Sequence, residues 1–350
     1  MSKYWTQLVT QLDPYVPGEQ PQDQQYTKLN TNENPYPPSP RVIDAINDYD
    51  KQNLKLYPDP ESSELKKTLA AYFSLKTNNV FLGNGSDEVL AHSFQAFFKQ
   101  SEPLLFPDIS YSFYTAYCGL YQIDFKQIPL DQNFNIQPID YEVKHGGIIL
   151  PNPNAPTGTA LSLNHIRDIV TNSSSVVIID EAYIDFGGES ATNLIKDFDN
   201  LLVIQTFSKA RSMAGLRLGY ALGHHDLIDA LNRIKNSFNS YPIDSLAQTA
   251  AIASINDEDY FQHNRQLIVQ TRESLTDELT DLGFEVLPST ANFVFVRHKS
   301  TAAQELYQQL KQQGILVRYF DKPRINNYLR ITIGTKSECQ HLVKVLADIL

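Results

Sequence analysis

The sequence contains little that would indicate a secreted or metal-stabilised protein. It has only two cysteines, Cys118 and Cys339, which lie far apart without the close spacing of metal ligands, so we expect no disulfide framework. The adjacent residues His224, His225 and Asp226 have no third ligand spaced along the chain, and we expect a loop at a helix start there instead of a metal site.

Long hydrophobic runs and an excess of positive charge are also missing. No run approaches the length of a membrane span, and the first residues contain no apolar signal core. The 29 lysines and arginines stand against 40 aspartates and glutamates, for a net charge of −11. We therefore expect a cytoplasmic protein that binds neither nucleic acid nor membranes, in which local arginines hold any anionic ligand.

Short apolar runs separated by helical patterns make up the first two thirds of the chain, whose 350 residues have room for about two domains. Runs that are apolar throughout are typical of strands in a mostly parallel sheet with helices on both faces. We predict such strands at 80–82, 104–106, 123–128, 147–150, 176–179 and 201–204.

The pattern changes after Pro242. Two long helices are expected at 243–255 and 257–281, followed by a smaller α+β unit with strands at 284–287, 292–296, 315–318 and 329–333 and helices at 302–313 and 337–350. The predicted division is an N-terminal arm and helix at 1–50 that packs with the small domain, a large domain at 51–242, and a small domain at 243–350.

The stretch from Thr206 to Gly219 follows the predicted strand at 201–204. The ends of strands in an α/β sheet are the usual place for a ligand, and Lys209 lies there among small and hydroxyl-bearing neighbours. Such a lysine can act as a nucleophilic amine, although a solvated surface lysine is the ordinary alternative. Two other features favour a ligand-binding site at Lys209. Asp180 ends another predicted strand, and a turn at Gly85 begins a helix whose free N–H groups suit a phosphate.

Four segments resemble the fold-type I aminotransferases that depend on pyridoxal phosphate (PLP). These segments are 156–158 (Pro-Thr-Gly), 180–183 (Asp-Glu-Ala-Tyr), 206–210 (Thr-Phe-Ser-Lys-Ala) and 215–219 (Gly-Leu-Arg-Leu-Gly). Within these enzymes the chain is similar to the histidinol-phosphate aminotransferase family at 14–18 (Pro-Tyr-Val-Pro-Gly), 29–35 (Leu-Asn-Thr-Asn-Glu-Asn-Pro), 57–58 (Tyr-Pro) and 328–335 (Tyr-Leu-Arg-Ile-Thr-Ile-Gly-Thr). The resemblance runs from Pro14 to the last helix.

The resemblance implies an enzyme that uses PLP to move an amino group from L-glutamate to imidazole acetol phosphate, giving L-histidinol phosphate and 2-oxoglutarate in histidine biosynthesis. Lys209 would bind the cofactor covalently and shuttle the proton, Asp180 would pair with the pyridine nitrogen, and Tyr183 would hydrogen-bond the ring oxygen. Tyr111 would stack on the ring. The cofactor phosphate would be held by Gly85, Ser86, Asp87, Thr206, Ser208 and Arg217.

Further residues follow from the same resemblance. Tyr57 would reach the cofactor phosphate across the interface of a homodimer. Arg330 would bind the carboxylate of glutamate and, with Arg318, the phosphate of the imidazole substrate, since a guanidinium matches both anions. Asn292 and Tyr15 are also expected at the substrate. For Arg318 a surface ion pair is an open alternative.

One position departs from the family pattern. The family commonly has Asn-Pro-Thr-Gly, with the asparagine donating to the ring oxygen, whereas this chain has Ala155 in that place. Asn152 or Asn154 would have to substitute, or Tyr183 would make that contact alone.

Three other functions are compatible with parts of the pattern. An aromatic amino acid aminotransferase and a threonine-phosphate-type PLP decarboxylase would use the same cofactor pocket. A PLP-binding regulator without turnover would need a DNA-binding domain ahead of the fold, where this sequence has a short proline-rich arm.

Overall fold

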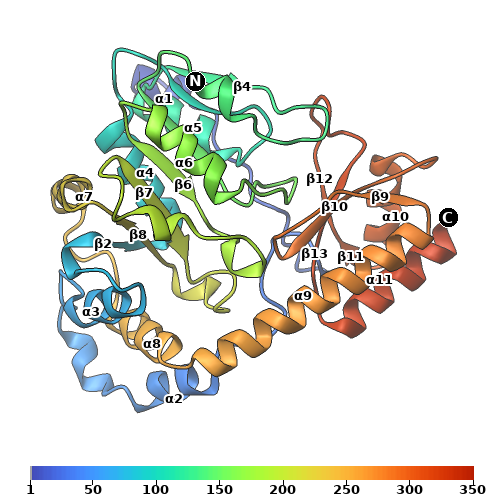
Figure 1. Ribbon diagram of the computed structural model, residues 1–350. Coiled ribbons are helices and arrows are strands. Elements are labelled where there is room, and N and C mark those ends of the chain that lie inside the picture. Colours follow the sequence, from blue (N-terminus) through green and yellow to red (C-terminus); the bar gives the residue numbers. More distant parts are fainter. Residues whose placement is uncertain (1) are drawn as a thin grey trace.

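The computed structural model describes residues 2–350, and its largest element is a seven-stranded sheet (Figure 1). The strand order is β2-β8-β7-β6-β5-β3-β4, and only β8 runs antiparallel to its neighbours. The strands are β2 (Val80–Asn84), β3 (Leu104–Pro107), β4 (Phe125–Ile128), β5 (Gly147–Pro151), β6 (Val177–Asp180), β7 (Leu201–Thr206) and β8 (Leu218–Gly223). The predicted mostly parallel α/β sheet is therefore confirmed.

Both faces of this sheet are buried, because successive side chains of a strand point to opposite sides. Ile178 and Leu202 belong to the core on one face, beneath α4, α5 and α7, whereas Val177 and Val203 belong to the core on the other face, beneath α3, α6 and α8. These helices are α3 (Ser63–Tyr72), α4 (Gly85–Phe97), α5 (Phe113–Tyr121), α6 (Leu163–Asn172), α7 (His225–Phe238) and α8 (Ser245–Ile255).

A second, antiparallel sheet has the order β12-β13-β10-β9 and packs with three helices. Its strands are β9 (Phe284–Val286), β10 (Phe293–His298), β12 (Arg318–Tyr319) and β13 (Leu329–Thr332), and the helices are α9 (Glu258–Asp281), α10 (Ala303–Gln312) and α11 (Lys336–Ile349). The long helix α9 runs from the end of α8 to this sheet (Figure 1).

The N-terminal segment touches both parts of the molecule. The short strand β1 (Thr27–Lys28) pairs in parallel with β11 (Ile315–Leu316), and α2 (Pro40–Asp48) packs against α8. A short helix α1 (Gln7–Gln11) precedes them. Val42 of α2 and Ala247 of α8 both belong to the core of the large sheet. The division into segments 1–50, 51–242 and 243–350 stays a prediction.

Several elements differ from the sequence-based expectation. The single strand expected at 315–318 is two strands in different sheets, since β11 pairs with β1 and β12 pairs with β13. The strand β8 and the helix α6 were not predicted, whereas the helix start expected at His224, His225 and Asp226 is confirmed as the start of α7. His224 caps α7, its ring nitrogen accepting the N–H of Asp226 at 3.4 Å. Within residues 2–350, no helix is long and apolar enough to cross a membrane.

Candidate active site

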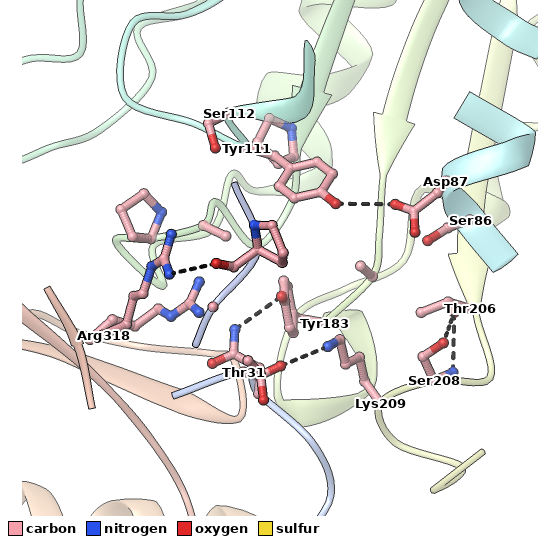
Figure 2. Close-up of a pocket in the computed structure, with 18 of the residues that line it drawn as sticks. Thr31, Ser86, Asp87, Tyr111, Ser112, Tyr183, Thr206, Ser208, Lys209 and Arg318 are labelled. Carbon is pink, nitrogen blue, oxygen red and sulfur yellow. Dashed lines mark hydrogen bonds between the residues drawn. The ribbon is translucent and has the colours of Figure 1, made fainter. Parts of the chain in front are cut away.

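A cavity of about 280 Å³ lies where the parallel strands of the large sheet end (Figure 2). Asp180 ends β6, Thr206 ends β7, and the first turn of α4 contributes Ser86 and Asp87. The second sheet and the N-terminal segment close the other side. The predicted residues that line the cavity are Tyr15, Ser86, Asp87, Tyr111, Asp180, Tyr183, Thr206, Ser208, Lys209, Arg217, Arg318 and Arg330.

Lys209 points into this cavity from the loop after β7. Its Nζ donates to the carbonyl of Thr31 at 3.2 Å and lies 5.7 Å from the ring centre of Tyr183. The Nδ2 of Asn34 donates to the carbonyls of Lys209 and Ala210 at 3.1 and 3.2 Å, which fixes the loop backbone. The amine is thus held on a rigid loop within reach of a ligand in the cavity.

Arg211, two residues further on, anchors the same loop from behind. Its side chain is buried, donates to the carbonyl of Ser254 at 2.7 Å, and lies 4.0 Å from the ring centre of Phe261. A cation over an aromatic face is stabilised when water is excluded. Arg211 therefore fastens the Lys209 loop to α8 and α9.

Asp180 is a buried carboxylate without a cationic partner among residues 2–350. Burial raises its pKa to about 6, while hydrogen bonds from the hydroxyl of Tyr114 at 2.7 Å and the N–H of Ala182 at 3.3 Å hold the pKa down. A carboxylate in such a place is stabilised by a cation that enters the cavity.

The anion-binding end of the cavity is formed by hydroxyls, an arginine and the start of α4. Ser208 and Thr206 are joined by two hydrogen bonds, from hydroxyl to hydroxyl at 3.0 Å and from the Ser208 N–H at 3.1 Å. Arg217 donates to Asp87 at 3.0 Å. A helix N-terminus beside hydroxyls and a guanidinium suits a phosphate.

Gly85 does not line the cavity, but its lack of a side chain shapes this end. Its φ is +78°, and a Cβ there would lie 2.4 Å from Nη2 of Arg217. Tyr111 lines the cavity and donates to Asp87 at 3.1 Å. Burial raises the pKa of Tyr111 well above its usual range, so its hydroxyl stays a donor.

Two arginines face the opposite end of the cavity, and neither forms an ion pair within residues 2–350. Arg330 donates from Nη2 to the carbonyl of Asn30 at 2.9 Å, and its buried Nε has no partner in the described structure. Burial lowers the pKa of Arg330. Arg318 reaches only the carbonyls of Val16 and Pro17, each at 3.4 Å. The surface ion pair considered for Arg318 is not formed.

Tyr57 and Asn292 lie outside the cavity. The side chain of Tyr57 is 83% exposed and its ring stacks on Tyr241 with the ring centres 4.8 Å apart. Asn292 is fully buried, and its Nδ2 donates to the carbonyl of Asn32 at 3.0 Å.

Neither asparagine near Ala155 takes the place of the missing amide. Asn152 is engaged with the backbone of Leu161 through both side-chain atoms, and Nδ2 of Asn154 donates to Ile109 and Thr157. Ala155 itself lines the cavity, but neither asparagine does. A different amide, Nδ2 of Asn32, donates to the hydroxyl of Tyr183 at 3.0 Å.

Sequence reasoning missed three residues of this site: Thr31, Asn32 and Tyr114. Thr31 and Asn32 lie in the segment that gave the resemblance, but no pattern indicated that they would face Lys209 and Tyr183. Tyr114 comes three residues after Tyr111, which precedes the start of α5, and the ring centres of the two lie 5.7 Å apart. That spacing was the available indication that a second phenol approaches the strand ends.

Comparisons with known proteins agree with this geometry. The family model described as aminotransferase class I and II matches residues 24–346. A protein of Hydrogenovibrio crunogenus named histidinol-phosphate aminotransferase 1 is 59% identical over 351 residues, covering 100% of this chain and 99% of its own. One of Pseudomonas syringae pv. syringae, named histidinol-phosphate aminotransferase, is 53% identical, and the match covers all of both chains.

Solved structures show the same fold. The histidinol-phosphate aminotransferase of Clostridium acetobutylicum superposes with a TM-score of 0.85 at 26% identity, covering 92% of this chain and 98% of that one. The enzyme of the same name from Sinorhizobium meliloti, solved in complex with pyridoxal-5′-phosphate, has a TM-score of 0.88 at 22% identity and covers 100% and 99% of the two chains.

Proposed function

Because the chain belongs to the class I and II aminotransferases, we propose that it is a PLP-dependent transaminase of histidine biosynthesis. It transfers an amino group between L-glutamate and imidazole acetol phosphate, giving L-histidinol phosphate and 2-oxoglutarate. The single observation that carries this proposal is one cavity that holds the Lys209 amine, a buried Asp180 carboxylate and two arginines without ion-pair partners among residues 2–350. No feature of the cavity favours the decarboxylase or the aromatic aminotransferase.

The residues present fit PLP. Asp180 is a buried carboxylate that lacks a cation in the described structure, and a protonated pyridine nitrogen would supply one. At the other end, Ser86, Ser208 and Arg217 line the cavity together, and Gly85 leaves room for the Arg217 guanidinium, which a Cβ at position 85 would approach to 2.4 Å. A dianionic phosphate is satisfied by such hydroxyls, backbone N–H groups and a guanidinium.

Bound PLP supplies an electron sink for the bonds of the substrate α-carbon. Lys209 holds and moves the proton at that carbon, since its amine is a basic group that lines the cavity. Asp180, when ionised, would pair with the pyridine nitrogen and keep it protonated. Tyr183 would donate its hydroxyl proton to the ring oxygen, and Tyr111 would stack on the ring.

Five residues orient the cofactor through its phosphate: Ser86, Asp87, Thr206, Ser208 and Arg217. This end of the cavity is formed by strand ends and a helix start, which are rigid elements. These residues would fix the cofactor relative to Lys209, and proton transfer requires such fixed geometry.

Arg330 and Arg318 bind the anionic groups of the substrates. Arg330 contacts the carboxylate of glutamate, and both guanidiniums contact the phosphate of the imidazole substrate. The unpaired Nε of Arg330 supports this assignment, because a buried N–H without a partner is costly until an acceptor arrives. Tyr15 lies beside them, with its ring centre 4.8 Å from that of Phe113.

The active unit is a homodimer in which Tyr57 reaches the phosphate site of the partner subunit. The exposure of Tyr57, together with the 58% and 59% exposed Leu54 and Leu56, supports this part of the proposal. Contiguous exposed apolar residues mark surfaces that another chain covers. The site of action is the cytoplasm.

The decisive assay measures glutamate-dependent amination of imidazole acetol phosphate beside that of phenylpyruvate. We expect the enzyme to prefer imidazole acetol phosphate, since Arg318 and Arg330 can bind its phosphate and phenylpyruvate has none. Equal or greater activity with phenylpyruvate would overturn the substrate assignment. The Lys209→Ala variant should lose both the visible absorbance of the PLP-loaded enzyme and the activity, and Lys196→Ala, at an exposed lysine outside the cavity, is the control.

A further inference from the structure

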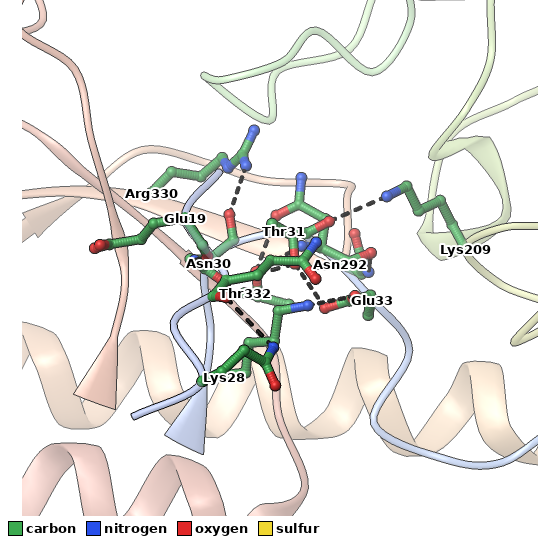
Figure 3. A network of polar contacts seen from close by, with 12 residues as sticks. Glu19, Lys28, Asn30, Thr31, Glu33, Lys209, Asn292, Arg330 and Thr332 are labelled. Atoms are coloured by element: carbon green, nitrogen blue, oxygen red, sulfur yellow. Dashed lines mark hydrogen bonds and ion pairs between the residues drawn. The ribbon is translucent and has the colours of Figure 1, made fainter. Parts of the chain in front are cut away.

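A chain of hydrogen bonds leads from the second sheet to the hydroxyl of Tyr183, through Asn32. Figure 3 shows Thr332 and Asn292 beside the N-terminal segment to which Asn32 belongs. Asn32 is 1% exposed and lies in the N-terminal segment between the two sheets. Thr332, at the end of β13, contacts it twice through its hydroxyl oxygen, at 3.0 Å from the backbone N–H and 3.0 Å from the side-chain oxygen. Asn292 donates to the carbonyl of Asn32 at 3.0 Å.

These contacts fix which way the Asn32 amide faces. The Thr332 hydroxyl oxygen accepts the backbone N–H of Asn32, and the same hydroxyl donates its proton to the side-chain oxygen of Asn32. The amide NH₂ of Asn32 is therefore the group that faces Tyr183. Without Thr332 the amide could turn over and present its oxygen to the phenol instead.

The direction of this bond decides what Tyr183 can do. A phenol has one proton to donate, and Tyr183 accepts from Asn32 while donating to no group within residues 2–350. Its proton is left for a ligand in the cavity. An overturned amide would take that proton for itself.

We propose that Asn32, held by Thr332 and Asn292, is a positioning residue that reserves the Tyr183 proton for the ring oxygen of the cofactor. This inference rests on the proposed PLP function. It accounts for Ala155, because with Asn152 and Asn154 engaged elsewhere, Tyr183 is left as the donor to that oxygen and its orientation has to be set.

Asn32 also suits the backbone at this place. Its φ is +57°, in the left-handed region that asparagine tolerates better than other residues with a side chain. A glycine could adopt the same backbone but would lose the amide. The Asn32→Gly variant therefore separates the side-chain role from the fold of the segment.

The test is the pH midpoint of the visible absorbance of the PLP-loaded enzyme, measured in the Thr332→Val variant. Valine keeps the branched shape and removes the hydroxyl. A donor to the ring oxygen stabilises the deprotonated chromophore, so weakening that donor should raise the midpoint by about 0.5 pH unit, the order of one neutral hydrogen bond. Thr332→Ser keeps the hydroxyl and should retain the wild-type midpoint.

Two further comparisons make the test specific. Thr271→Val removes a hydroxyl that bonds only to the Leu267 carbonyl within α9, and it should leave the midpoint unchanged. In a Tyr183→Phe background, Thr332→Val should cause no additional shift, because the proton it protects is gone. If Thr332→Val does not fold, Asn32→Gly replaces it, and its shift is again compared with and without Tyr183→Phe.

An unchanged midpoint in the variant, or the same shift with and without the Tyr183 hydroxyl, would overturn the inference. Failure of the wild-type protein to develop visible absorbance with PLP would instead overturn the proposed function, so the two failures are distinguishable.

Discussion

Replacing Tyr114 with phenylalanine should weaken cofactor binding in a pH-dependent way. Tyr114 lies fully buried in α5, and its hydroxyl donates to Asp180 at 2.7 Å. The substitution removes one hydrogen bond and leaves the ring packing intact. Burial already raises the pKa of Asp180 to about 6, and the hydrogen bond from Tyr114 lowers it. Asp180 should therefore ionise less readily when that bond is lost.

The size of the effect follows from that one bond. A hydrogen bond to a charged group contributes about 1.5–3 kcal/mol, and about 1.4 kcal/mol corresponds to one pKa unit. The pKa of Asp180 in the cofactor-free variant should therefore rise by about 1–2 units, to about 7–8. At pH 7 the ionised fraction falls from roughly nine tenths to between a half and a tenth.

The assay is titration of the cofactor-free protein with PLP at several pH values, followed by visible absorbance. PLP pairs with the ionised carboxylate, so Kd at pH 7 should increase about 2–10-fold, and the two proteins should converge above about pH 9. Titrations of PLP itself affect both proteins equally and cancel in the ratio of the two Kd values.

Tyr141→Phe is the matched control. The Tyr141 hydroxyl is buried but has no partner among residues 2–350, so its loss should leave the Kd ratio at one throughout. A Kd ratio for Tyr114→Phe that stays constant from pH 6 to 9 would show that Tyr114 does not control the ionisation of Asp180.

Three further changes have defined outcomes. Glu181 is buried and its pKa is raised to about 7, so its ionisation destabilises the cofactor-free protein as pH rises from about 4.3 through about 7. In denaturant unfolding, the free energy of unfolding should fall by about 2–3 kcal/mol less between pH 5 and 8 in Glu181→Gln than in the wild type. The same dependence of unfolding free energy on pH in both proteins would contradict this. Arg330→Lys keeps the charge but not the planar fork, so KM for glutamate should rise about tenfold in steady-state assays while the visible spectrum of the loaded enzyme stays unchanged; an unchanged KM would remove Arg330 from the substrate site. Co-expression of Tyr57→Ala with Lys209→Ala should give hybrid dimers with activity that neither parent has, since one site per hybrid is then intact; inactive hybrids would argue against a shared site.

The sequence predicted the parts of the fold that depend on local pattern. The runs at 176–179 and 201–204 are apolar and short, and the strands β6 and β7 that contain them are buried; these properties are sufficient to identify parallel strands. The strand β8 was missed because its six residues include Gly219 and Gly223, which are poor strand formers. Both glycines are needed for close approach, since a Cβ at 219 would lie 2.3 Å from the Ser86 nitrogen.

The candidate site was predictable where motifs carried it, and not where contacts join distant segments. Lys209 and Asp180 follow predicted strands, so the sheet brings them together without further information. The bond from Tyr114 to Asp180 and the bond from Asn32 to Tyr183 depend on packing between segments 66 and 151 residues apart. No periodicity or propensity encodes such a distance. Their detection required the three-dimensional arrangement.

The pairing of β1 with β11 has a consequence for how the protein matures in the cell. Thr27 lies beside Ile315, so this two-residue ladder joins two stretches that are made far apart during translation. The cavity likewise takes residues from Tyr15 to Arg330. A nascent chain in which Arg330 has not yet been made therefore has no complete pocket.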